Sequence, residues 1–271
     1  MAHGLFHSNK HGDVHGLGHG TLTLNRSTII PGVSRDSSSG IYVPATAGEW
    51  TTLMSAAGLA TGNPSMLHLL QEASGNPADS IGTFTLTASG TGVTYQLAVP
   101  GWTRKSIMTT AGGTALLTNT DAGLPNIATN SFMIMGYVLV TDTAANRDIA
   151  SMGTSPRVLA QTTGTTGVAR ITCAGSTSSG TLDQGGVVRP FVLQINRTNS
   201  TCNFWSNSER VTPTFGGTVT GQSVSMGNIV AGPGTVSYLY MAGWFNAAAE
   251  MTSAQVKQML TTLGWTGIPW T

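Results

Sequence analysis

The chain has 271 residues and a formal net charge of +1, and only 8% of its residues are charged. Soluble proteins average roughly 25% charged residues, so glycine, threonine and serine must cover much of this surface. The twelve lysines and arginines are scattered singly. This argues against a nucleic-acid partner, because phosphate binding needs a basic stripe. No apolar run approaches the roughly 20 residues that a membrane span requires.

The low charge also bears on association. Little electrostatic repulsion opposes contact between copies of a near-neutral chain, so we expect a subunit whose surface is partly covered by neighbours. The first residues, MAHGLFHSNK, lack the basic-then-apolar order of a secretory signal. We therefore expect a protein that is made in the cytosol and not secreted.

Residues 1–40 show no sustained apolar periodicity apart from the short run TLTLNRSTII at 21–30. We predict an extended N-terminal arm, rich in glycine and histidine, followed by one domain over residues 41–271. Within the arm a histidine stands at every fourth position: His3, His7, His11, His15 and His19.

A period of four places all five histidines on one side of an extended chain. Successive rings would then lie about 13 Å apart, too far to share a metal within one chain, and the glycines between them disfavour a helix. Parallel arms around a symmetry axis would form rings of histidines that bind a transition metal or respond to pH. Three interpretations stay open: a flexible arm with incidental histidines, an arm laid on neighbouring subunits, and a dedicated metal site.

Two segments have helical patterns. Thr46 and Glu49 have the spacing of a capping box and begin a predicted helix near 46–58. Thr252 and Gln255 have the same spacing at the start of a helix near 252–263, which Gly264 would end. Most of the remaining chain alternates short β-rich runs with polar turns, which predicts an all-β sandwich or barrel. The clearest of these runs are 82–89, 93–99, 131–140, 168–175, 189–197, 201–207 and 236–245.

The short polar turn after Arg197 predicts that runs 189–197 and 201–207 pair as a hairpin. The two cysteines, Cys173 and Cys202, both lie in strand-like runs. Two cysteines are too few for a disulfide framework. We favour two buried thiols that pack as small hydrophobes, and a bridge between strands stays open.

Three ordered stretches resemble the concanavalin A-like lectin/glucanase fold in its laminin-G-like branch, as found in bacteriophage virion structural proteins. They are HLLQEASGNPADSIGTFTLTASG (68–90), FVLQINRTNSTCNFWSNSERV (191–211) and YLYMAGWFNAAAEMTSAQVKQMLTTLGW (238–265). The resemblance implies a two-sheet antiparallel jelly-roll sandwich with short accessory helices. It further implies recognition of a glycan, a peptide or a protein partner, often without catalysis.

The residues themselves provide no catalytic constellation. Glycan hydrolysis needs two carboxylates close together. None of the four glutamates, Glu49, Glu72, Glu209 and Glu250, has an acidic residue two or four positions further on. A Ser-His-Asp triad would have to use His68, whose apolar surroundings suggest a structural role in the core or on a sheet face. We therefore predict no catalytic residues and no enzymatic activity.

Candidate binding residues lie in turns. Trp102, beside Arg104 and Lys105, is the best candidate for a ligand or partner contact, because sugar faces stack on aromatic rings. Trp205, Trp244 and Trp265 are better explained by core packing, and Trp270 could anchor the C-terminal tail on the body or on a neighbour. Turn residues Asn76, Asp79 and Asp121 are weak calcium candidates, and ordinary bonding of local backbone amides explains them better. The cofactor hypotheses are thus calcium or a histidine-bound transition metal, and the sequence requires neither.

These features favour a non-enzymatic virion protein, either decorating the capsid or built into the tail, that is assembled in the host cytoplasm. The arm would attach it, and the histidines of the arm would contact other virion proteins or copies of the same chain. The sandwich would present a surface for binding, for example to a cell-surface glycan. A free carbohydrate-binding lectin or adhesin is the alternative, and a glycan hydrolase is the least favoured class.

Overall fold

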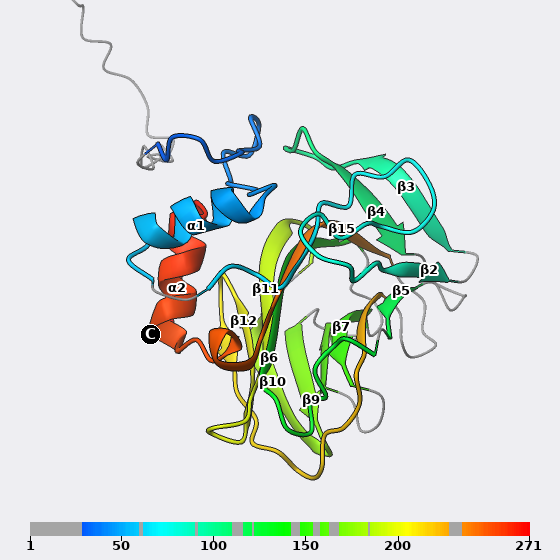
Figure 1. Ribbon diagram of the computed structural model, residues 1–271, viewed down its shortest axis with the longest axis vertical. Helices are drawn as coiled ribbons and strands as arrows, with labels where there is room; N and C mark the ends of the chain where they lie inside the picture. The colour runs from blue at the N-terminus through cyan, green and yellow to red at the C-terminus, as the bar shows by residue number, and fades with distance from the viewer. Residues whose placement is uncertain are drawn as a thin grey trace, which may run out of the picture.

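The computed structural model describes residues 29–59, 62–89, 92–109, 116–120, 122–141, 147–153, 158–162, 168–183, 185–227 and 235–271. Within these ranges the protein is an all-β sandwich of two antiparallel sheets, with two short α-helices packed outside it (Figure 1). The fold class expected from the alternation of β-rich runs and turns is therefore confirmed.

The first sheet has eight strands and contains the longest ones. Its central strands are β11, β6 and β15, and β1 pairs with the second half of β15 beyond the end of β4. In order across the sheet the strands are β13 (Arg210–Val211), β12 (Thr201–Ser206), β11 (Val188–Asn196), β6 (Phe132–Val140), β15 (Val236–Phe245), β4 (Lys105–Thr109) and β3 (Val93–Ala98), with β1 (Met66–His68) off this path. The hairpin predicted between runs 189–197 and 201–207 is the β11–β12 pair.

The second sheet has seven shorter strands. In order across the sheet they are β10 (Ser176–Asp183), β9 (Val168–Cys173), β8 (Val158–Thr162), β7 (Arg147–Met152), β14 (Val224–Gly227), β5 (Leu116–Asn119) and β2 (Thr87–Ser89). Most of these strands have no clear sequence signal. The predicted strand at 82–89 is correct only for β2, because the amides of Phe84 and Leu86 bond to Asp79 and Pro77 in the preceding loop instead of to a neighbouring strand.

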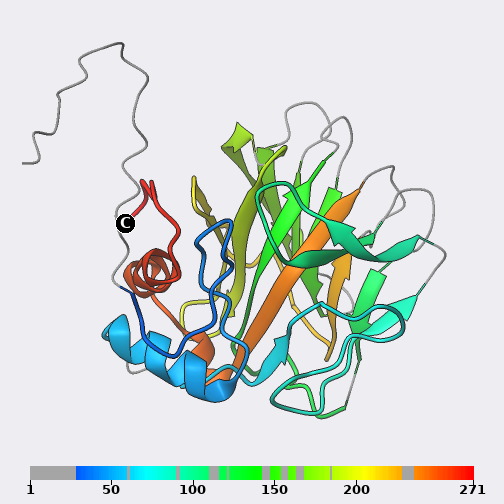
Figure 2. The ribbon, with the colours of Figure 1, turned by 90° about the horizontal axis from the view of Figure 1, so that it is seen from above.

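Two hydrophobic cores lie on opposite faces of the first sheet. One, the inner core, fills the space between the two sheets. The other, the outer core, lies between the first sheet, the helices and the segment before α1. All nine residues of β6 and nine of the ten in β15 are consequently buried. Figure 2 shows the helices and the N-terminal part of the described chain as a layer beside this sheet.

The two helices begin where the sequence places them. Helix α2 (Ser253–Thr262) starts with the full capping box of Thr252 and Gln255. Helix α1 (Ala47–Ala56) has Thr46 as its N-cap, but the Glu49 carboxylate accepts from the amides of Ser34 and Ala45, so the predicted reciprocal box is wrong in its second half. A 3₁₀ turn, η1 (Asn246–Ala249), precedes α2. Neither described helix has the length and apolarity to cross a membrane.

The last part of the predicted arm packs against the body. Ile30 and Val33 are buried in the outer core, and Arg35 forms an isolated β-bridge with Tyr42. Residues 1–28, and with them all five histidines of the four-residue repeat, lie outside the described residues. That repeat and its role therefore stay a prediction.

Cys173 on β9 and Cys202 on β12 form a disulfide that joins the two sheets. The favoured expectation of two free buried thiols is thus wrong, and the alternative of a bridge between strands is correct. The tail is anchored on the body, because the Trp270 indole donates to the carbonyl oxygen of Ser206 at 2.8 Å. Trp205, Trp244 and Trp265 are buried, as core packing predicts.

The disulfide closes a loop with a sequence separation of 29, so it restricts the unfolded chain. We expect reduction to lower the free energy of unfolding by about 3 kcal/mol. The measurement is urea denaturation with and without dithiothreitol. A Cys173→Ala/Cys202→Ala variant should show the lower stability in both conditions. An unchanged wild-type midpoint under reduction would contradict this expectation.

Candidate functional site: a groove beside the outer core

A groove of about 1200 Å³ opens where the outer layer meets the ends of β6 and β11. The residues that line it are Ile29, 35–41 before α1, 100–102, Leu139 near the end of β6, 186–188 at the start of β11, Asn207 and 264–266 after α2. In Figure 2 the segment before α1, in dark blue, runs between the C-terminal residues and the sandwich. The groove is therefore built from parts of the chain that are far apart in sequence.

The Asp36 carboxylate connects two walls of the groove. Its Oδ1 atom accepts from the amides of Ser38 and Ser39 at 3.1 and 2.9 Å and from the Ser39 hydroxyl. Its Oδ2 atom accepts from the amides of Thr103 and Arg104, both at 2.9 Å, and from the Thr103 hydroxyl. One buried carboxylate thus fixes the turn at residues 36–40, here called the serine turn, against the turn that carries Trp102.

These contacts change the acidity of the group. Burial alone would raise the pKa of Asp36, but the hydrogen bonds from Ser39, Thr103 and Arg104 outweigh it and lower the pKa from 3.8 to about 2. Asp36 is only 2% exposed. The Asp36 carboxylate is therefore ionised at neutral pH, and its two oxygens accept hydrogen bonds from Ser38, Ser39, Thr103 and Arg104.

Aromatic rings form one side of the groove. The half-buried Trp102 ring lies 5.8 Å from the ring of Tyr137 and 6.2 Å from that of Trp265, which in turn packs edge-on against Tyr137 at 5.2 Å. Burial raises the pKa of Tyr137, whose hydroxyl donates to the Tyr42 carbonyl oxygen. The contacts of Tyr137 and Trp265 hold Trp102 in place at the groove.

Polar residues, several of them exposed, also line the groove. Ser37 and Ser38 carry exposed hydroxyls, and Asn207 is half-buried. Arg35 is exposed, its Nε atom donates to the Gly40 carbonyl oxygen, and its guanidinium lies 5.3 Å from the centre of the Tyr42 ring. The groove thus combines an aromatic side with hydroxyl, amide and guanidinium groups.

Of the three predicted binding residues, Trp102 lines the groove. Arg104 is half-buried, and its Nη2 atom donates to the Leu69 carbonyl oxygen at 3.0 Å. Burial lowers the pKa of Arg104. Lys105 is exposed, and neither basic residue is among those that line the groove. The structure therefore separates Trp102 from its two neighbours in sequence.

The proposed calcium ligands bond to backbone amides. Asp79 accepts from Leu67, Ile81 and Phe84 through its two oxygens, and the Asn76 side-chain oxygen accepts from Ala88. The bonds from Ile81 and Phe84 are the local amide bonds that the sequence favoured, whereas those from Leu67 and Ala88 join residues twelve positions apart. Asp121 lies outside the described residues. Within the part of the chain that the structure describes, no three His, Cys, Asp or Glu residues are grouped as a metal site.

His68 lies in the centre of the molecule on β1. Its side chain is fully buried, and its Nδ1 atom is 3.0 Å from the Ala78 carbonyl oxygen. Burial lowers the pKa of His68, against the opposing effect of the nearby Asp79 and Glu72 carboxylates. Among the described residues, its Nε2 atom has no hydrogen-bond partner. His68 thus connects β1 to the following loop.

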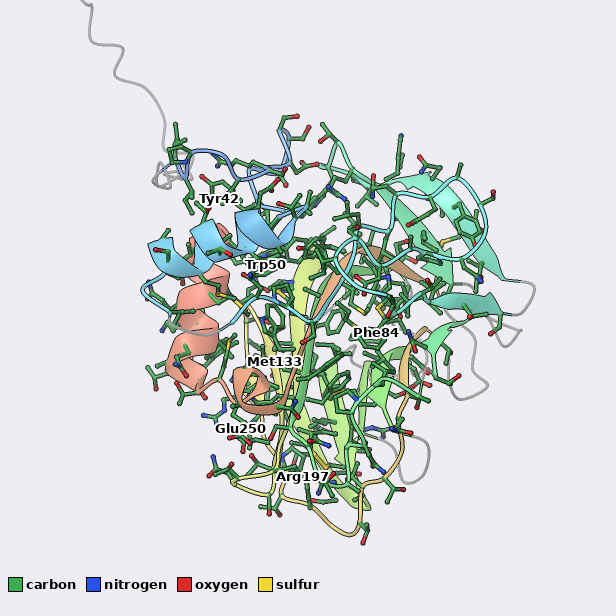
Figure 3. All side chains as sticks on the ribbon, in the orientation of Figure 1. Tyr42, Trp50, Phe84, Met133, Arg197 and Glu250 are labelled. Atoms are coloured by element: carbon green, nitrogen blue, oxygen red, sulfur yellow. A yellow bond between two sulfur atoms is a disulfide. The ribbon has the colours of Figure 1, made fainter. Side chains whose placement is uncertain are left out.

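A second, smaller pocket of about 390 Å³ lies at the other end of the molecule, where Figure 3 labels Arg197 and Glu250 far from Tyr42. The Glu250 carboxylate accepts from the hydroxyls of Ser131 and Thr198, and the first of these bonds is the main cause of its lowered pKa. Arg197 donates to the Val219 carbonyl oxygen. The charged groups of this pocket therefore bond to neighbouring protein groups and fix the loops around it.

The serine turn of the groove is not among the binding residues predicted from the sequence. The stretch RDSSSG at 35–40 has a signal that could have indicated it, because an aspartate before serines and a glycine is typical of a turn that bonds its own amides. The link from Asp36 to Thr103 has no such signal, since 67 residues separate the two.

No protein-family model matches the chain, and no curated protein sequence matches it. Several solved structures have a similar fold. Trypanosoma rangeli sialidase, in complex with 2,3-difluoro-KDN, matches 87% of this chain and 36% of its own at 10% identity and a TM-score of 0.57. The same sialidase in complex with the inhibitor DANA matches 76% of this chain and 34% of its own, at 10% identity and a TM-score of 0.56.

The binding domain of botulinum neurotoxin DC, in complex with rat synaptotagmin II, matches 73% of this chain and 51% of its own at 11% identity and a TM-score of 0.52. The chain thus spans about half the length of the toxin domain and about a third of the sialidase. These similarities show a shared β-sandwich fold.

The lowered pKa of Asp36 makes a prediction about acid stability. A carboxylate whose pKa falls from 3.8 to about 2 on folding stabilises the protein above pH 3.8, and this contribution is lost as the pH falls through 2. We expect Asp36→Asn to lower the free energy of unfolding at neutral pH by about 1–3 kcal/mol, since several donors lose a charged acceptor. The free energy of unfolding of the variant should also fall less than that of the wild type as the pH is lowered from 3.8 to about 2. Denaturation at a series of pH values measures both, and parallel pH profiles of variant and wild type would contradict the prediction.

Proposed function

We propose that this protein is a non-enzymatic, lectin-like binding protein that holds a glycan in the groove beside Trp102. The observation that carries the proposal is the combination of a fixed, half-buried indole with exposed hydroxyl and amide groups in one groove. Binding pockets typically combine apolar and aromatic walls with a few polar groups that orient the ligand. A pyranose ring has this dual character, with an apolar face of C–H groups and an equatorial rim of hydroxyls.

The comparisons support a binding role of this kind. The toxin domain has also been solved in complex with SialylT, with 8% identity to this chain and a TM-score of 0.51, and the sialidase structures contain sugar-acid ligands. One of the similar structures is therefore a binding domain, while the sialidase is an enzyme. The fold is therefore compatible with either role, and the residues of this chain favour one of them.

The contacts of the glutamates support a role without catalysis. Glu49 accepts from Ser34 and Ala45, Glu72 from Ala78, and Glu209 from Thr181 and Leu182. Glu250 accepts from Ser131 and Thr198. Each glutamate therefore accepts hydrogen bonds from other groups of the protein, and none is among the residues that line the groove. Most glycoside hydrolases place two carboxylates on opposite sides of the scissile bond, and no such pair is among the residues that line the groove.

The place of the protein in a virus particle belongs to the same proposal. It is supported by the low charge of the chain, by the histidine-rich N-terminal segment and by the resemblance of three stretches to phage structural proteins. In this role residues 1–28 attach the protein to other virion proteins or to further copies of itself, and the sandwich carries the groove outward. A free lectin would bind the same glycans without this attachment.

Replacement of Trp102 tests the binding role. We expect Trp102→Ala to weaken glycan binding at least about tenfold, because the stacking surface is lost. Glycan-array screening followed by calorimetry is the measurement. Leu182→Ala removes an exposed apolar side chain that does not line the groove, and Lys105→Ala removes a charge close to Trp102 in sequence. Both controls should bind as the wild type does. Loss of binding in Lys105→Ala but not in Trp102→Ala would place the ligand elsewhere.

Deletion of residues 1–20 tests the attachment. We expect the truncated protein to keep the thermal stability of the full chain, because the described body begins at residue 29 and includes its own cores. Incorporation into particles should be lost, as measured by co-sedimentation with virions. Normal incorporation of the truncated chain would refute the role of the segment, and a monomer that binds glycans would favour the free lectin.

A further inference from the structure

Resting on the proposed glycan-binding function, we infer that the groove selects acidic sugars, with Arg35 as the residue that binds the sugar carboxylate. Arg35 and Asp36 are the charged residues among those that line the groove. They differ in what they present to a ligand, and this difference sets the selectivity.

Asp36 presents little negative charge to the groove. Its side chain is 2% exposed, and its two oxygens accept six hydrogen bonds from Ser38, Ser39, Thr103 and Arg104. An acidic ligand therefore meets no exposed carboxylate oxygen from this residue. The carboxylate acts on the ligand only through the two turns that it connects.

Arg35, by contrast, is exposed and held in position from three sides. Its backbone pairs with Tyr42, its Nε atom donates to the Gly40 carbonyl oxygen, and its guanidinium lies over the Tyr42 ring. The Nη groups are the remaining donors of the guanidinium. A guanidinium binds a planar carboxylate through two parallel N–H···O bonds. A side chain that is already fixed loses less entropy when it forms them.

The other groups of the groove suit the rest of such a ligand. Trp102 provides a surface for the apolar face of a sugar ring, and the exposed hydroxyls of Ser37 and Ser38 stand next to Arg35 in sequence on the same wall. Val187, 53% exposed at the groove, offers an apolar contact to an acyl or methyl substituent. The arrangement thus fits a carboxylate-bearing sugar such as a sialic or uronic acid.

Matched pairs of ligands test the selectivity on the full-length protein. Sialyllactose is compared with its methyl ester, and trigalacturonic acid with its methyl ester, so that each pair differs mainly in the carboxylate. We expect the acidic member of at least one pair to bind about tenfold more tightly than its neutral partner. The preference should shrink as salt rises from about 50 to about 200 mM, because an exposed ion pair is screened. Lactose sulfate distinguishes a carboxylate site from a site for any anion, and sulfate binding as tight as that of sialyllactose would overturn the carboxylate assignment.

Arg35→Gln should remove the preference, so that the variant binds the acidic ligand no more tightly than its neutral partner. Lys105→Ala, which removes a cation outside the groove lining, should keep the preference. The wild-type comparison of ligand pairs remains decisive if Arg35→Gln proves unstable. Equal affinity for acidic and neutral members in every pair would overturn this inference while the proposed glycan binding stands. The proposed function itself would be overturned if the wild type bound no glycan, or if Trp102→Ala bound every glycan as tightly as the wild type does.

Discussion

The burial of the first sheet on both faces is the constraint on which the rest of this structure depends. An antiparallel sheet commonly has one solvated face, but here α1, α2 and the segment before α1 cover the second face with a core of their own. The central strands β6 and β15 are therefore apolar along almost their whole length, and β11 is buried from Pro190 to Asn196. In this outer core the Trp50 indole donates to the Tyr240 hydroxyl, which donates to the Pro44 carbonyl oxygen.

The groove follows from the same outer layer. The segment that covers the sheet turns at residues 36–40, and Asp36 fixes this turn to Thr103 and Arg104 at the start of β4. Trp102 is thereby held at the border of the outer core, with one part packed on Tyr137 and another part lining the groove. The structural role and the proposed binding role thus meet in one short stretch.

The disulfide fits the proposed life of the protein in a particle. Cys173 and Cys202 are fully buried between the sheets and join them covalently. Such bonds persist in oxidising surroundings and are rare in the cytosol. A protein assembled in the cytoplasm and then released in a particle would meet these surroundings outside the cell. The low surface charge also suits a protein packed among neighbours.

The sequence by itself determined the fold class, the capped starts of both helices and the long central strands, because these depend on local spacing and on apolar runs. It could not fix the edges of the second sheet, where polar strands such as β10 are defined by their partners. It left the pairing of Cys173 with Cys202 open for the same reason. The tertiary structure alone decided that Trp102 shares a groove with Arg35 while Arg104 bonds to Leu69. Contacts between residues so far apart arise from packing, and local sequence carries no record of them.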